Sequence, residues 1–244
     1  MRRSSKIIVV SLLAAWAGAA GAITWGDKTV PDPIDAGKTC AVRQPLSWGG
    51  YIYEFPTKYD MVFWPFTDGG GLWYCEGSGY ISFLNDFKDV SEDERTAIAA
   101  WLKGRDKPAD VAGRLAQLEG IYALRKKDPA FRNELLRTLA RWYQQLGDLP
   151  RANEYRRTAL AQIVARLETD PTPLPETQRL EYLYLAANYT RLFGDVAASD
   201  AWLAQLRAAA DGVKDPKAKD AAGFVRKLAE DTPKIKPGGK LDPV

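Results

Sequence analysis

Two segments of this 244-residue chain match each other at an offset of 47 residues. Residues 129–168 hold two amphipathic stretches joined at Gly147-Asp148, and residues 175–210 hold two joined at Gly194-Asp195. A glycine that ends one helix, followed by an aspartate that begins the next, is typical of a short turn between antiparallel helices. The recurrence predicts two similar antiparallel helix pairs, and therefore a largely helical second half of the chain.

The first pair resembles a tetratricopeptide (TPR) repeat. Residues at the spacing of that motif are Leu136, Leu139, Ala140, Tyr143, Gly147, Ala152 and Ala159, with small side chains where two helices must approach closely. Arg156 and Val164 depart from the pattern, and 47 residues exceed its period of about 34. We predict TPR-like helix pairs, with amphipathic helix pairs of another kind as the alternative.

Further helices are expected on either side of these pairs. Ser91 and Glu94 form a capping box that opens a helix ending at Gly104. Residues 109–127 carry an apolar stripe, and a last helix is expected from Pro216 to Asp231. We therefore assign residues 89–231 to a helical domain, and we expect the polar tail 232–244 to be disordered.

Residues 23–88 differ sharply from the rest because they are rich in glycine, proline and aromatic side chains. The segment 49–55 alternates aromatic residues on one face of an extended strand, residues 60–66 suggest a second strand, and the glycine turn at 68–71 leads into a third. We predict a small β-rich module followed by an all-α domain, which makes the fold class α+β.

Residues 1–22 have the features of a secretory signal peptide: a basic start, an apolar run and the small-residue site Ala20-Gly21-Ala22. An uncleaved membrane anchor is the alternative. Cleavage would lower the formal net charge from +3 to zero, which disfavours binding to nucleic acid. We expect a periplasmic, secreted or cell-surface protein with no membrane span after cleavage.

The chain contains no histidine and two cysteines. The missing histidine excludes histidine-based general acid–base catalysis and most zinc and copper sites. A carboxylate pair or a lysine would remain for an enzyme, but no nucleophile is placed with a base, so we expect no enzyme and no cofactor. In an oxidising compartment, two cysteines are more often bonded to each other than free.

Cys40 and Cys75 lie in "TCAVRQ" and "WYCEGSGYISFLNDF". Together with the helices that follow, these segments resemble the bacterial proteins grouped as domain-of-unknown-function family 2225, in which two Cys-Pro-x-Cys knuckles precede helices. The two cysteines match the first ligand of each knuckle, whereas Arg43 and Ser78 replace the second ligand. The surrounding pattern is kept at Gly79-Tyr80 and Asp86-Phe87.

The resemblance implies architecture rather than an activity. Because paired knuckles face each other, losing one ligand from each would leave Cys40 and Cys75 close together, with too few ligands for structural zinc. The resemblance therefore implies a Cys40–Cys75 disulfide in place of a metal site. Two unpaired buried cysteines are the alternative.

Polar residues on the first helix of each pair are the candidates for binding a partner in a concave groove. They are Arg137, Arg141, Gln144, Asn188 and Arg191, and a solvated helix face is the alternative explanation for them. Most aromatic residues of the β module are expected to form its core. Trp48, Tyr51 and Trp64 are the candidates for an exposed contact face.

These observations favour an exported, non-enzymatic interaction or assembly protein that uses a TPR-like helical surface to bind another protein, or a copy of itself. Two alternatives remain open. The aromatic module could bind or act on carbohydrate, or the chain could be a subunit of an extracellular filament.

Overall fold

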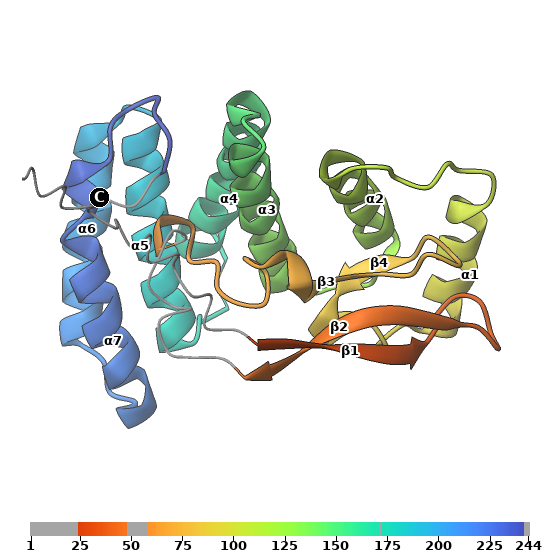
Figure 1. Ribbon diagram of the computed structural model, residues 1–244. Helices are drawn as coiled ribbons and strands as arrows, with labels where there is room; N and C mark the ends of the chain where they lie inside the picture. Colours follow the sequence, from red (N-terminus) through yellow and green to blue (C-terminus); the bar gives the residue numbers. More distant parts are fainter. Residues whose placement is uncertain (1–23, 48–57, 171, 242–244) are drawn as a thin grey trace, which may run out of the picture.

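The computed structural model describes residues 24–47, 58–170 and 172–241, and its α+β architecture is shown in Figure 1. Strands β1 (Thr24–Pro31) and β2 (Thr39–Ser47) pair antiparallel, with Val30 opposite Cys40. The short strands β3 (Leu72–Tyr74) and β4 (Ile81–Phe83) form a second antiparallel hairpin. The predicted fold class, with strands early in the chain and helices after them, is confirmed.

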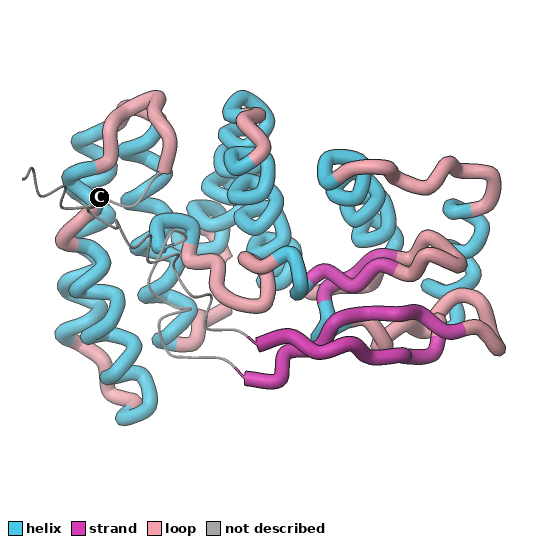
Figure 2. Tube along the Cα trace, in the orientation of Figure 1, coloured by secondary structure: helices cyan, strands magenta, loops and turns pink. Residues whose placement is uncertain are grey.

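Seven helices follow the strands in the described part of the chain, and Figure 2 shows how they stand side by side. Their bounds are α1 Glu92–Leu102, α2 Val111–Leu124, α3 Pro129–Gln145, α4 Leu149–Glu168, α5 Glu176–Leu192, α6 Val196–Asp211 and α7 Pro216–Ala229. The capping box at Ser91 opens α1 as expected, with the Glu94 amide donating to the serine hydroxyl and Glu94 accepting in return from the Ser91 amide.

The expected recurrence of helix pairs is visible in the helix bounds. Helices α3 and α5 begin 47 residues apart, as do α4 and α6. In both pairs the turn uses a glycine in the left-handed region, with φ of 85° at Gly147 and 95° at Gly194. In both, the following aspartate, Asp148 or Asp195, caps the next helix. The chain therefore builds the same helical hairpin twice; its assignment to the TPR family stays a prediction.

The hydrophobic core does not divide where the predicted domain boundary at residue 88 lies. One cluster of buried residues joins the hairpins to the first helices, with Cys40 and Phe83 packed together with Ile98 of α1 and Leu118 of α2. The other cluster joins α4 to α7 and includes Tyr59 and Met61 from the early segment. The β module is thus completed by α1 and α2, because two short hairpins alone bury too little apolar area.

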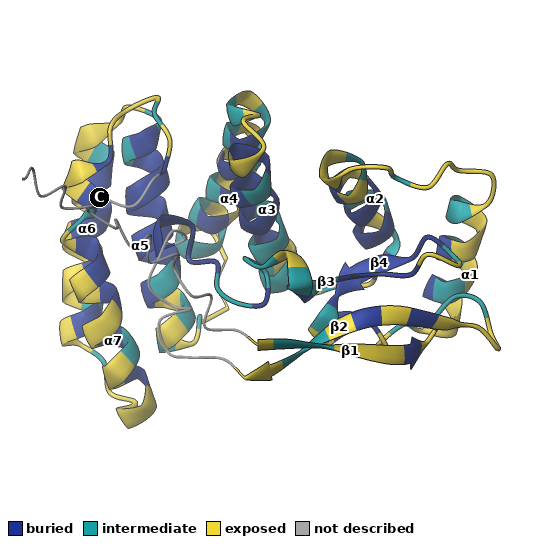
Figure 3. Ribbon diagram, viewed as in Figure 1, coloured by how far each residue is buried: buried dark blue, intermediate teal, exposed yellow. Residues whose placement is uncertain are grey.

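Helix α5 lies at the centre of the helical part, and Figure 3 shows it as buried along most of its length. It packs against α4, α6 and α7, and the segment that contains the 3₁₀ turn η2 (Lys58–Asp60) runs past it. Residues 60–66 therefore do not form the expected strand: they continue from this turn as an irregular segment bound to helices.

The expected disorder of the tail is wrong for residues 232–241. After the 3₁₀ turn η5 (Thr232–Lys234), Ile235 and Leu241 are buried at 6% and 1% exposure. The Gly238 amide donates to the Leu192 carbonyl at 2.7 Å, and the backbone of Leu241 bonds to the Gln144 side chain. The burial of Ile235 and Leu241 against the helices orders this part of the tail in spite of its polar composition. None of the helices in the described part is long and apolar enough to cross a membrane.

Candidate interaction site

The helical part already binds a short segment of the chain itself, the 3₁₀ turn η2 and the residue that follows it, Met61. Asn188 on α5 donates to the Tyr59 carbonyl at 3.1 Å. Arg137 on α3 donates to the carbonyls of Asp60 and Met61 at 2.8 and 2.9 Å. These three bonds hold the main-chain carbonyls of residues 59–61.

The side chain of Asp60 anchors this segment. Arg156 on α4 binds its two carboxylate oxygens through Nε and Nη2, both at 2.9 Å, and the Tyr189 hydroxyl donates to Oδ1 at 2.8 Å. The charged groups of Asp60 and Arg156 are fully buried, at 1% and 0% side-chain exposure. Burial, followed by the nearby charge of Asp60, raises the pKa of Tyr189 well above its usual value, so the hydroxyl keeps its proton and donates.

The ends of the segment are fixed by the C-terminal part of the chain. Lys58, whose side chain is fully buried, pairs with Asp231, and the Asn188 amide oxygen accepts a bond from the Thr232 hydroxyl at 2.7 Å. The same asparagine therefore binds the early segment with its nitrogen and the tail with its oxygen. Helices α3 to α5, residues 58–61 and the tail form one packed unit.

Four of the five polar residues that are candidates for binding a partner are buried. Arg137, Arg141, Gln144 and Asn188 are between 0% and 7% exposed. Three of these bind the chain's own segments: Arg137 and Asn188 hold residues 59–61, and Gln144 holds Leu241. The fifth, Arg191, is partly buried and pairs with Asp200 on α6 at 3.2 Å. The polar groups of these side chains therefore bond to other parts of the same chain.

Where the early segment leaves the helices, a cleft remains open between the N-terminal halves of α3 and α5. It consists of two adjoining cavities of about 510 and 360 Å³ that share Asp128, Ala130, Gln178 and Tyr182. Met61 and Phe63 of the early segment line the smaller cavity. We call this hollow the α3–α5 cleft. It continues the path of the bound segment along the same helices.

The α3–α5 cleft carries unmatched negative charge. Arg137 pairs with Glu181 at 2.8 Å and Arg166 with Asp170 at 3.2 Å. Asp128 and Glu134 form no salt bridge with another described residue, although Asp128 caps α3 through the Phe131 amide and Arg137 lies near Glu134. Burial raises the pKa of Glu134; Arg137 opposes this and Glu181 adds to it. An unpaired carboxylate with a shifted pKa in a cleft marks a candidate functional site.

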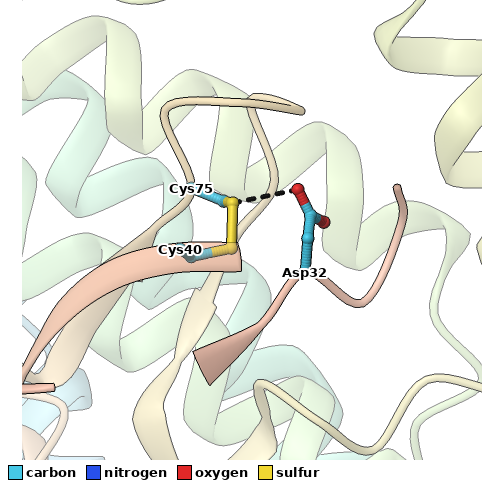
Figure 4. Close-up of side chains that lie close together, drawn as sticks. All are labelled: Asp32, Cys40 and Cys75. Atoms are coloured by element: carbon cyan, nitrogen blue, oxygen red, sulfur yellow. Dashed lines mark hydrogen bonds between the residues drawn. A yellow bond between two sulfur atoms is a disulfide. The ribbon is translucent and has the colours of Figure 1, made fainter. Parts of the chain in front are cut away.

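The two cysteines form the expected disulfide, shown in Figure 4, with their Cα atoms 4.9 Å apart. Both are buried, and the bond joins β2 to the turn after β3. Asp32 lies beside it, with Oδ2 3.0 Å from the Cys75 sulfur, while its Oδ1 accepts from the Ile34 amide and the Ser78 hydroxyl. Because a disulfide sulfur carries no proton, this contact is not a thiol hydrogen bond.

These three residues are also the one group in the described part whose donor atoms lie close enough to hold a metal, within 4.8 Å of one another. With both sulfurs in a disulfide they are not thiolates, so the cluster does not bind a metal in this state.

The aromatic residues of the β module mostly form its core, as predicted. Trp73, Tyr74, Tyr80, Phe83 and Phe87 are buried in the cluster of the hairpins, whereas Tyr59 is buried against the helices instead. Trp64 is partly buried, and Trp48 and Tyr51 lie outside the described residues. In the described part, therefore, none of the three proposed contact aromatics forms an open face.

Sequence reasoning missed Asp60 and the roles of Arg156 and Glu134. A signal for one of them was present: Arg156 stands where the TPR pattern has an aromatic residue. A positive charge at a position that faces the partner helix would be buried. It therefore predicts an acidic residue elsewhere in the chain that pairs with it. Nothing in the sequence identifies that group as Asp60, 96 residues away.

Comparison of the chain with protein-family models, curated proteins and solved structures gives no match. The resemblance to family 2225 therefore remains a prediction, and function has to be argued from the geometry.

Proposed function

We propose that this protein is an exported, non-enzymatic interaction or assembly protein that binds a short segment of a partner protein in the α3–α5 cleft. One observation carries the proposal. The same helices bind residues 59–61 through main-chain carbonyls, with Asn188 and Arg137 as donors. Helices that hold the carbonyls of one short segment in this way have the chemistry to hold another segment where the cleft is open.

The open part of the groove also fits a particular kind of partner. The carboxylates of Asp128 and Glu134 form no salt bridge with another described residue, while Gln178 and Tyr182 add polar groups to the walls. A lysine or arginine side chain in the partner segment would pair with Glu134 and recover the cost of its burial. The partner segment is therefore basic.

Export is part of the proposal. A buried disulfide is stable in an oxidising compartment and rare in the cytosol, so the Cys40–Cys75 bond supports a periplasmic or secreted location. The signal peptide predicted for residues 1–22 lies outside the described residues.

Site-specific crosslinking in the native envelope tests the proposal. A photoreactive phenylalanine analogue would replace Gln178, which lines both cavities of the cleft. The matched control carries the analogue at Lys219, an exposed position on α7. We expect one defined crosslinked species from Gln178, none from Lys219, and loss of the species when Glu134→Gln is added. Equal crosslinking at both positions, or none at Gln178, would refute the cleft as the site.

A further inference from the structure

A second hollow, of about 330 Å³, lies between the two hairpins and helix α2. Its walls come from β1, β2, the Gly69–Gly70 turn and β3, and four charged residues line it: Asp27, Arg43, Glu76 and Arg114. Its volume falls at the lower end of the range for small-molecule sites. We call it the hairpin pocket.

Tyr74, which also lines the hairpin pocket, has a hydroxyl that lacks a partner. The residue is 8% exposed, and its oxygen is buried without a hydrogen bond to any described residue. The Arg114 guanidinium lies over its ring, 4.7 Å from the centroid. Buried hydroxyls nearly always have a hydrogen-bond partner, and this one has none among the described residues although Tyr74 lines the pocket.

The charges of the pocket are only partly paired within the protein. Asp27 and Arg43 are opposite each other in the β1–β2 register, yet no salt bridge joins them in the part of the chain that the structure describes. Arg114 and Glu76 make a loose pair at 3.6 Å, with side chains 45% and 76% exposed. The Trp73 indole donates to the Arg43 carbonyl and fixes that strand against β3. Two guanidinium and two carboxylate groups thus surround one hollow.

The pocket offers no open aromatic face to a ligand. Trp73 and Tyr74 are both below 9% exposure, and Arg114 covers one face of Tyr74. A sugar ring would need an open aromatic face on which to stack, and these two rings offer none. The carbohydrate alternative therefore gains no support from this pocket.

We propose that the hairpin pocket binds a small zwitterion of the amino-acid type. The guanidinium groups of Arg43 and Arg114, which match a carboxylate in geometry, hold its carboxylate together with the Tyr74 hydroxyl. Asp27 and Glu76 hold its ammonium group. The four charges of the pocket sum to zero, which fits a ligand without net charge.

Calorimetric titration of the full-length protein with L-alanine, L-glutamate and L-lysine tests the proposal. Acetate and methylammonium, which carry one half of the zwitterion each, are the control ligands. We expect at least one amino acid to bind about tenfold or more tightly than either half, since both charge pairs contribute. We expect Arg43→Gln to weaken that binding by about tenfold or more and Arg207→Gln, in a separate hollow between α6 and α7, to leave it unchanged.

Tyr74→Phe separates a ligand-binding role from a structural one. Removing an unpaired buried hydroxyl should leave the melting temperature of the free protein unchanged or raise it. The same substitution should weaken amino-acid binding several-fold. The proposal is overturned if none of the three amino acids binds, if acetate alone binds as tightly, or if Arg43→Gln has no effect on affinity.

Discussion

At the scale of single residues, the stability of the fold depends on the pairing of the buried charges of Asp60 and Arg156. The pair is buried and doubly hydrogen-bonded, so removal of one charge leaves the other without compensation in the core. We expect Asp60→Asn to lower the free energy of unfolding by about 3 kcal/mol. Urea unfolding measures this. Asp200→Asn, which breaks the exposed pair with Arg191, is the control and should cost less than about 1 kcal/mol; similar losses in both variants would contradict the prediction.

Glu94 gives the stability of the molecule a dependence on pH. Burial raises the pKa of its carboxyl, but the Lys126 and Ser91 amides and the Arg125 guanidinium outweigh this and lower the pKa to about 2. The lowered value means that the ionised carboxyl stabilises the fold fully above the unfolded pKa of about 4.3. That contribution is lost as the pH falls toward 2.

Comparison of Glu94→Gln with the wild type checks this dependence. At pH 7 the variant should be less stable by about 2 kcal/mol, and the difference should shrink as the pH falls from about 4.5 to 2. Glu92→Gln, at an exposed position in the same helical turn, should show almost no difference at any pH. A gap between wild type and Glu94→Gln that does not change with pH would show that the charge is not the cause.

At the scale of the elements, the C-terminal tail acts as a structural part of the helical unit. Leu241 is 1% exposed, and its backbone bonds to Gln144 on α3. Leu241→Ala should lower the free energy of unfolding by about 2 kcal/mol, whereas Leu146→Ala, at a residue 44% exposed, should change it little. Chemical denaturation of the two variants checks this, and equal effects would mean that the tail contributes nothing.

The disulfide holds the first hairpin to the second. It closes a loop of 35 residues, for which chain entropy predicts a stabilisation of about 3–4 kcal/mol. The double variant Cys40→Ser, Cys75→Ser should lose roughly that amount in urea unfolding. A thiol assay on the denatured, unreduced protein should find no free thiol; two reactive thiols would contradict the bond.

The elements differ in how far the sequence predicts them. The helices follow from caps and apolar periodicity, and α3 to α6 lie where the repeat places them. Strand β1 was missed because most of its residues are exposed, so it lacks the alternation that reveals a half-buried strand. The strand expected at residues 60–66 is absent because its apolar residues face helices instead of a sheet.

At the scale of the whole molecule, residues 58–71 connect the two hydrophobic clusters. Tyr59 and Met61 belong to the cluster of α4 to α7, whereas Phe66 packs against Phe83 in the other, with ring centroids 4.5 Å apart. We therefore expect the two clusters to unfold together. Hydrogen exchange should give similar opening free energies for the most protected amides of α2 and α5. Full protection of α5 with fast exchange throughout α2 would show two independent units.

The candidate sites were less predictable than the fold because they depend on contacts between distant residues. Arg137 and Asn188 were candidates for binding a partner, but no sequence pattern indicates that they bind residues 59–61 of the same chain. Likewise, the hairpin pocket joins β1, β2 and α2, whose residues share no local pattern. Contacts between residues that lie far apart along the chain leave no periodic pattern in a single sequence.

Because residues 58–61 occupy part of the groove, a free peptide has to displace them before it can bind there. A tethered occupant competes at an effective concentration on the order of millimolar, without the entropy loss of a free ligand. A soluble peptide with the sequence of residues 58–61 would therefore fail to displace it, even though it can make the same contacts. This internal competition prevents weakly matching peptides from binding where residues 58–61 lie. A segment of a partner protein can therefore bind only in the part of the groove that residues 58–61 leave open.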